Sequence, residues 1–307
     1  MSTKYFPQNF YLNKNMNKKY LIVSGCSWAD PHTDSEDPRV SHDIVKGYNR
    51  WFNILADKLD MQLINFGKYA SGNEYICSSL IDNISAMGEK KRSNIGLVIA
   101  AWSEAKRTDF EWKQNENDYY VKNLFEHKYK EYRYNPKYIW DSILYTDPLR
   151  GDMFYRVKQS IRYMYMLQTF LKHNNIPYKM VQATPLQKLT YMDTEYNLGL
   201  TLGTPQRSLK SFKDIESEID EQLAEELSQF PVYNLIDTNN FISWPILTSS
   251  LYEKLDPEKD FITNLMEKKS DFRQDNHPNQ SGHNKISNII LNNINIRVLK
   301  GEMISLI

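Results

Sequence analysis

The chain has 307 residues, 41% of them hydrophobic, which is enough to bury one sizeable core. Its 38 basic residues balance its 38 acidic residues and the pI is about 7.0, which excludes bulk electrostatic attraction to nucleic acid or to an anionic membrane surface. Two cysteines exclude a disulfide framework, and residues 1–20 lack the apolar segment of a signal peptide; since no long apolar run follows either, we expect a cytoplasmic protein without a membrane span.

Strands and helices alternate after an N-terminal arm that we expect over residues 1–18. Apolar runs of β-type residues predict strands, and apolar residues spaced three and four apart predict helices. The first five predicted elements are a strand at 19–25, a helix at 47–60, a strand at 61–67, a helix at 73–87 and a strand at 95–102. The last of these reads IGLVIAAW and is apolar throughout, as expected for a parallel strand covered on both faces.

The alternation stops at 105–150, a stretch dense in Tyr, Lys, Asn and Glu. We expect an insertion there, as a lid, a sugar-binding surface or a packed addition. The pattern then resumes with a helix at 153–175, a strand at 176–183, a charged helix at 214–230, a short strand at 233–237 and a final helix at 281–294. This order predicts one domain over 1–307, with a central, mostly parallel five-stranded sheet in a three-layer α/β/α arrangement.

Two small nucleophilic residues follow the first predicted strand, in the stretch SGCSWAD at 24–30. The carboxyl end of a parallel strand is where open α/β sheets bind ligands, and Gly25 permits a tight turn there. Ser27 is the favoured nucleophile; Cys26 is the alternative, although a small buried residue at a strand end is its simpler interpretation. No phosphate-binding glycine motif follows this strand and no Cys/His zinc spacing is present, so we expect no cofactor and no metal.

A second polar group precedes the final predicted helix, where residues 272–286 read FRQDNHPNQSGHNKI. A Ser at the end of the first strand and an Asp/His pair before the last helix resemble the SGNH hydrolase superfamily, also called GDSL-like esterases and lipases. Gly25-Cys26-Ser27 stands where that family usually has Gly-Asp-Ser, and Asp275-Asn276-His277-Pro278 stands for Asp-x-x-His-Pro, one residue shorter. The GCS, WS…R and D-x-HP…GH blocks together are similar to a divergent branch found in phage and marine bacterial genomes.

The resemblance implies a flavodoxin-like fold and a serine ester hydrolase that needs no cofactor. Its substrate would be an acyl or O-acetyl ester of a carbohydrate or lipid, that is, a small-molecule or glycan ester. Ser27 would attack the carbonyl carbon, His277 would take its proton, and Asp275 would orient and stabilise the imidazolium. On an extended segment, Asp275 and His277 would lie on the same face.

The family also supplies an oxyanion hole, which the resemblance places at the backbone N–H groups of Ser27 and Gly72. The usual third block, Gly-x-Asn-Asp, is missing, and AAWSEAKR at 100–107 stands in its place. Substitute donors would be the hydroxyl of Ser103 or the amide of Asn73. Glu104 would disfavour an oxyanion nearby, unless its carboxylate points away or pairs with Arg107.

Several alternatives remain open at this point. His283 is a second candidate for the base, Asp271 for the carboxylate and Gly67 for the oxyanion donor. A metal site is conceivable in the polar stretch after the first strand, built from His32 and His42 with Asp30, Asp34 and Asp37.

The altered third block and the short Asp-to-His spacing favour an alternative function. The chain would then be a non-catalytic or repurposed SGNH-like binding or structural protein, virion-associated if it is encoded by a phage. An acyl- or glycan-transferring enzyme with the same triad is a third possibility. We expect no nucleic-acid partner, and the sequence leaves the oligomeric state open.

Overall fold

The computed structural model describes residues 18–31, 48–68, 71–105, 107–109, 138–139, 153–186, 224–246, 249–262 and 275–294. The predicted N-terminal arm, except for Lys18, and most of the insertion at 105–150 lie outside these residues. Only the end of the predicted helix at 214–230 is described, and residues 224–228 are helical there. The prediction of a single domain over 1–307 extends over the undescribed stretches and stays a prediction.

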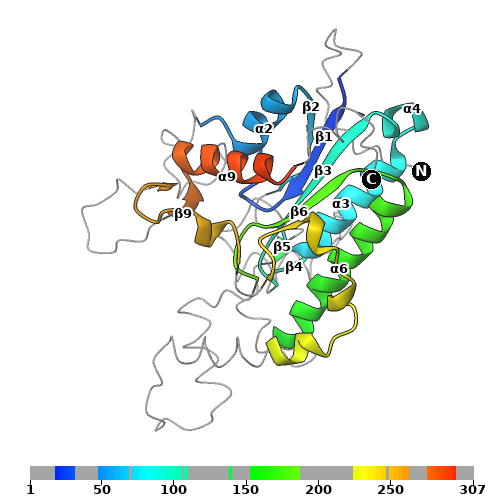
Figure 1. The fold of residues 1–307 in the computed structure, drawn as a ribbon, viewed down its shortest axis with the longest axis vertical. Coiled ribbons are helices and arrows are strands. Elements are labelled where there is room, and N and C mark those ends of the chain that lie inside the picture. The colour runs from blue at the N-terminus through cyan, green and yellow to red at the C-terminus, as the bar shows by residue number, and fades with distance from the viewer. Residues whose placement is uncertain are drawn as a thin grey trace, which may run out of the picture.

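The centre of the fold is a five-stranded parallel sheet (Figure 1). Four of its strands lie where the apolar runs predicted them, and the α/β class with a parallel sheet is confirmed. In sheet order the strands are β2 (Gln62–Asn65), β1 (Tyr20–Gly25), β3 (Ile95–Trp102), β6 (Tyr178–Gln182) and β7 (Phe241–Ile242). All neighbouring pairs are parallel, so all carboxyl ends meet at one edge of the sheet.

The prediction of the fifth strand is corrected by the structure. The predicted strand at 233–237 is instead a 3₁₀ helix, η4 (Tyr233–Leu235), and the strand forms later, at β7. Gln168 accounts for the difference, because its amide accepts from the Asp237 N–H at 2.7 Å and donates to the Leu235 carbonyl at 2.8 Å. These backbone groups are therefore satisfied by a side chain rather than by a neighbouring strand.

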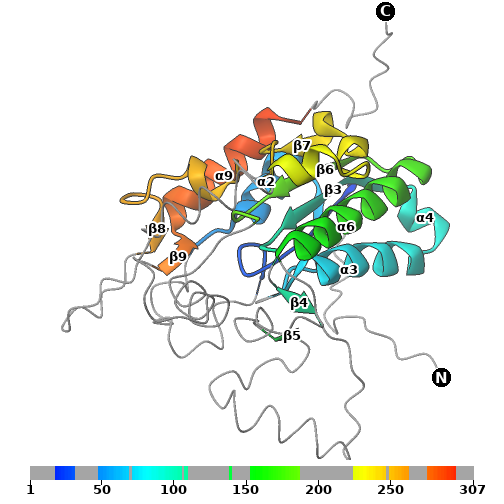
Figure 2. The same ribbon diagram turned by 90° about the horizontal axis from the view of Figure 1, so that it is seen from below.

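Two pairs of helices cover the two faces of the sheet (Figure 2). Period-two alternation along the strands separates the two cores: Ile22 and Val98 belong to one, Leu21 and Leu97 to the other. The first core includes residues of α3 (Asn73–Ala86) and α6 (Met153–His173), and the second includes residues of α2 (Trp51–Leu59) and α9 (Gln280–Asn292). These four helices were predicted; the short α4 (Glu89–Arg92) was not.

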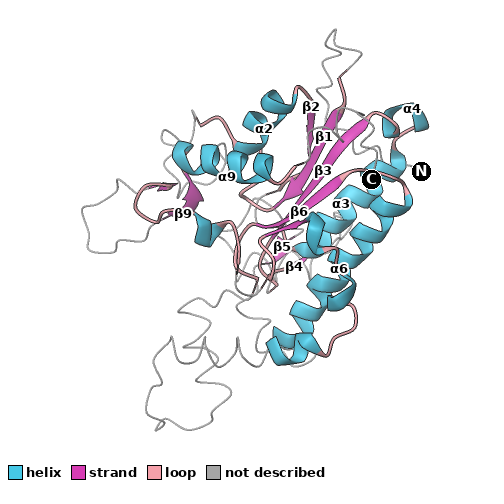
Figure 3. Cartoon of the chain, viewed as in Figure 1, coloured by secondary structure: helices cyan, strands magenta, loops and turns pink. Residues whose placement is uncertain are grey.

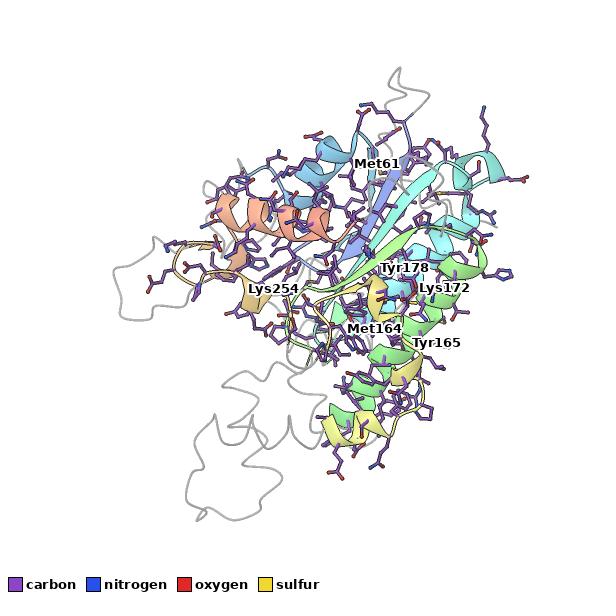
Figure 4. The ribbon with its side chains drawn as sticks, in the orientation of Figure 1. Met61, Met164, Tyr165, Lys172, Tyr178 and Lys254 are labelled. Carbon is purple, nitrogen blue, oxygen red and sulfur yellow. The ribbon has the colours of Figure 1, made fainter. Side chains whose placement is uncertain are left out.

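At the amino end of β6, one carboxylate ties three elements together. Asp237 Oδ2 accepts from the Tyr178 hydroxyl at 3.2 Å and lies 2.7 Å from Lys172 Nζ. Figure 4 shows Lys172 and Tyr178 close together, at the end of α6 and the start of β6. The polar sequence before β7 is thereby held at the edge of the sheet opposite the carboxyl ends.

Two short antiparallel ribbons lie outside the main sheet, and neither was predicted. One pairs β4 (Thr108–Asp109) with β5 (Tyr138–Ile139); the other pairs β8 (Phe261–Ile262) with β9 (Asp275–Pro278). Figure 3 shows β9 beside α9 and away from the main sheet. Two further 3₁₀ helices are η5 (Thr238–Asn240) and η6 (Tyr252–Lys254). Within the described ranges, no helix is both long and apolar enough to cross a membrane.

Candidate functional site

The loop after β1 is a tight, buried turn. The Ala29 N–H donates to the Cys26 carbonyl at 2.8 Å, and Ser27 is only 5% exposed. Gly25 is required here by close approach, because a Cβ at this position would lie 2.8 Å from the Cβ of Ala29 and 2.9 Å from that of Ala101. Ser27 therefore lies just beyond the carboxyl end of β1, as the sequence predicted.

The structure brings this loop together with the strand that carries His277. The Trp28 ring lies 6.3 Å from the Phe261 ring, between ring centroids, and 6.2 Å from the Tyr252 ring. Phe261 is in turn the antiparallel partner of Pro278, the residue next to His277. Two segments from opposite ends of the chain are thus packed at the same edge of the sheet.

A bulge interrupts the ribbon at His277. Phe261 is paired with Pro278 and Ile262 with Asp275, so Asn276 and His277 are inserted between two successive pairs of the ladder. Alternation of side chains fails across such a bulge, and the expected same-face relation of Asp275 and His277 no longer follows from it.

Several predicted residues cannot be placed. The side chain of Asp275 lies outside the described residues, so its contact with His277 stays a prediction. Asp271, and the residues of the conceivable metal site other than Asp30, also lie outside them: His32, Asp34, Asp37 and His42.

His283, the alternative base, is fully buried in the first turn of α9. Its Nε2 lies 3.3 Å from Arg50 Nη1, and because arginine only donates, Nε2 is the acceptor and the proton is on Nδ1. Burial, together with the nearby charges of Arg50 and His277, lowers the pKa of His283 to about 3. The ring is therefore a neutral acceptor within the core.

Gly72, the expected oxyanion donor, is the N-cap residue of α3, and its N–H is already engaged. It donates to Asp109 Oδ1 at 2.7 Å, while the Tyr75 N–H donates to Asp109 Oδ2 at 2.8 Å. Burial raises the pKa of Asp109 to about 6, even though these two hydrogen bonds and Arg107 act in the opposite direction. Sequence reasoning missed Asp109, whose only signal was its position at the start of an irregular stretch.

Asn73 and Ser103, the expected substitute donors, are bonded to each other. Asn73 Oδ1 accepts from the Ser103 N–H at 2.8 Å, and its Nδ2 donates to the Ser103 carbonyl at 3.1 Å and to Ser160 Oγ at 3.0 Å. Asn73 is 2% exposed and Ser103 is fully buried. The pair fastens the start of α3 to the end of β3 through the Asn73 amide and the Ser103 backbone, whereas the buried Ser103 hydroxyl, the expected donor, has no hydrogen-bond partner within the part of the chain that the structure describes.

Glu104 pairs with Arg107, which is the condition that keeps its charge away from an oxyanion. Glu104 Oε2 lies 3.0 Å from Arg107 Nε, and both side chains are less than 10% exposed. Arg107 also donates to the Ser71 carbonyl at 3.3 Å and lies against the Cys26 thiol. Burial acts to lower the pKa of Arg107, but Glu104 and Cys26 outweigh it and raise the pKa. Cys26 itself is fully buried.

A cavity of about 350 Å³ lies beside this cluster, between the first turn of α3 and the first three turns of α6. Its lining includes Arg107, Asp109, Arg156, Gln159 and Tyr163. Trp102, in the stretch that replaces the third block, is fully buried in the core with α3 and α6.

Among the described residues, no group of three or more His, Cys, Asp or Glu side chains is arranged to hold a metal ion.

No protein-family model matches the chain, and no curated protein matches it in sequence. The relation to the SGNH superfamily therefore remains an interpretation of the motifs.

Proposed function

We propose that the protein is a serine ester hydrolase of the SGNH type, with Ser27 as nucleophile and His277 as base. The observation that carries the proposal is the contact of Trp28 with Phe261, which packs the Ser27 loop against the ribbon of His277. The strand order 2-1-3-4-5 is that of flavodoxin-like folds, whose ligands bind at the carboxyl ends of the strands. Both segments lie at that edge.

The chemistry proceeds in two halves. Ser27 Oγ attacks the ester carbonyl carbon while His277 takes the hydroxyl proton, and the alcohol leaves with that proton, which gives an acyl-serine. Water then attacks the acyl-serine with His277 again as base, and the acid is released with Ser27 protonated. Asp275 orients the imidazole and stabilises its charged form.

The oxyanion hole is the weak part of this site. In this mechanism Gly72 can donate to the substrate only when Asp109 releases its N–H, because the two acceptors compete for one donor. One missing donor typically lowers kcat by about 10²–10³-fold. We therefore expect slow hydrolysis as long as Asp109 is in place.

The charged and hydrogen-bonding side chains that line the cavity favour a carbohydrate ester over a lipid ester. Arg107 lines the cavity and also lies against Cys26, so the cavity adjoins the nucleophile loop. Two arginines and two carboxylates, Glu74 and Asp109, balance each other in its lining and offer both donors and acceptors. This suits hydroxyl groups better than a long acyl chain.

Labelling with a fluorophosphonate probe, together with hydrolysis of small aryl esters, tests the proposal. Ser27→Ala and His277→Gln should abolish both, because each removes a reacting group. Cys26→Ala, and Ser93→Ala at an exposed serine, should retain both. Unchanged hydrolysis in pure Ser27→Ala protein would rule the proposal out.

A second candidate is a non-catalytic, SGNH-like binding protein. The observation that favours it is the engagement of the Gly72 N–H by Asp109 and of the Asn73 amide by Ser103 and Ser160. Under this alternative, folded wild-type protein does not label at all. Stoichiometric labelling that depends on Ser27 would exclude it.

A further inference from the structure

Residues 48–51 connect the two halves of the proposed site; we call them the bridging segment. On one side they contact the first turn of α9. The Asn49 N–H donates to Gln280 Oε1 at 2.8 Å, and Gln280 Nε2 donates back to the Asn49 carbonyl at 3.1 Å. Arg50 donates to His283, and the Tyr48 ring lies 6.5 Å from the His283 ring, between ring centroids.

On its other side the bridging segment contacts the nucleophile loop. Trp51 Nε1 donates to the Trp28 carbonyl at 2.7 Å, one residue from Ser27. Burial lowers the pKa of Arg50, while the charge of Asp30, at the end of the same loop, acts to raise it. Arg50, Trp51 and Asp30 are each less than 10% exposed.

The α9 end of this connection is bonded to the β8–β9 ribbon, whose strand β9 carries His277. Asn279 caps α9 by accepting from the Gly282 N–H at 3.1 Å, and its Nδ2 donates to the Phe261 carbonyl at 2.9 Å. These two bonds join the first turn of α9 to the β8–β9 ribbon. The bridging segment thus lies between the loop of Ser27 and the element next to His277.

We propose that the bridging segment sets the separation of Ser27 and His277, and that Arg50 is its central positioning residue. This inference rests on the proposed function. Nucleophile and base must be held within a fraction of an ångström, and a misplacement of 1 Å can lower a rate by about 10²-fold. The arginine suits this role because its guanidinium bonds to His283 of α9, while the charge of Asp30 in the nucleophile loop acts on it.

The variants are Arg50→Lys, which keeps the charge but loses the fork, and Gln280→Ala, which removes the paired bonds to Asn49. Each should lower kcat for an aryl ester and the rate of Ser27 labelling by about tenfold or more, with KM unchanged, because ground-state binding is not affected. Lys58→Met is the matched control. It removes a hydrogen bond of 2.6 Å to Asn288 that joins α2 to α9 away from the site, and it should label like wild type.

The outcomes separate the two proposals. If wild-type protein does not label, or labels without Ser27, the proposed function is wrong and the role of the bridging segment falls with it. If labelling depends on Ser27 but folded Arg50→Lys and Gln280→Ala label at the wild-type rate, only the positioning role is wrong. If Arg50→Lys does not fold, Gln280→Ala alone decides.

Discussion

Two ionisable residues, the buried His283 and the half-buried Asp109, respond to pH in opposite directions. The pKa of His283 falls from 6.5 to about 3, so between these values the unfolded chain binds a proton that the native state does not, and this residue makes stability rise with pH. The pKa of Asp109 rises from 3.8 to about 6, so the native state binds the extra proton and stability falls as pH rises through this window. The two effects partly cancel in wild-type protein.

Replacing His283 should remove its contribution to the pH dependence of stability, so a comparison with wild type measures that contribution. We expect the stability advantage of wild type over His283→Gln to shrink by about 1.4 kcal/mol for each pH unit below 6.5, because only wild type must leave a histidine neutral on folding. Urea unfolding at pH 5.0, 6.0 and 7.0 measures it. His173→Gln, an exposed site at the end of α6, is the control. A difference that is constant across these pH values would contradict the assignment.

The Glu104–Arg107 pair should contribute far more than a surface pair. Glu104→Gln removes the carboxylate that is ion-paired with a buried guanidinium, and we expect a loss of about 3–5 kcal/mol in the free energy of unfolding. Glu226→Gln breaks the exposed pair with Lys158 and should lose no more than about 1 kcal/mol. Equal losses for the two variants, measured by urea unfolding, would show that Arg107 is not buried as described.

At the scale of elements, the N-terminus of helix α3 is capped by a residue of another element. Its N-cap residue is Gly72, which has no side chain to accept a hydrogen bond, and Asp109 of β4 accepts from the first turn instead. Helix α9, in contrast, is capped by its own Asn279. Asp109, near the start of the stretch at 105–150, is therefore bonded to Gly72, the expected oxyanion donor.

Asp109→Ala should move stability and reactivity in opposite directions. The loss of a helix cap lowers the free energy of unfolding by about 1–2 kcal/mol, while the released Gly72 N–H raises the rate of Ser27 labelling by up to about 10²-fold. Asn279→Ala, the matched control, removes the cap of α9 and should lower stability without raising the labelling rate. A lower labelling rate in Asp109→Ala would mean that Gly72 is not an oxyanion donor.

At the scale of the whole molecule, one sheet separates two cores. Leu80 of α3 lies in one core and Ile290 of α9 in the other, and both are fully buried. Because β1, β3 and β6 contribute residues to both cores, neither core can be lost without exposing the other face of the same strands. We therefore expect both to unfold in one transition.

Leu80→Ala and Ile290→Ala test this coupling. Each should lower the free energy of unfolding by about 2–5 kcal/mol, because a large buried side chain is removed and leaves a cavity. Tryptophan fluorescence and far-UV circular dichroism should follow one shared urea transition in both variants. Separate transitions in either variant would show that the two cores are independent.

The sequence by itself determined the elements whose burial leaves a local period. Four strands and four helices lie within a few residues of their predicted bounds, because burial on one or both faces imposes a repeat that can be recognised in a single segment. It also placed Ser27 at the carboxyl end of β1, since a strand and the turn after it are both local features.

Only the tertiary structure decided the partners of the site residues. The hydrogen bond of Gly72 to Asp109 spans 37 positions and that of Arg50 to His283 spans 233, and no local pattern encodes such a pairing. The bulge at His277 depends on Phe261 and Ile262, and the position of β7 depends on Gln168 of α6. Hydrogen bonds and charges are satisfied wherever the chain brings a partner close, so these features follow from how distant segments pack.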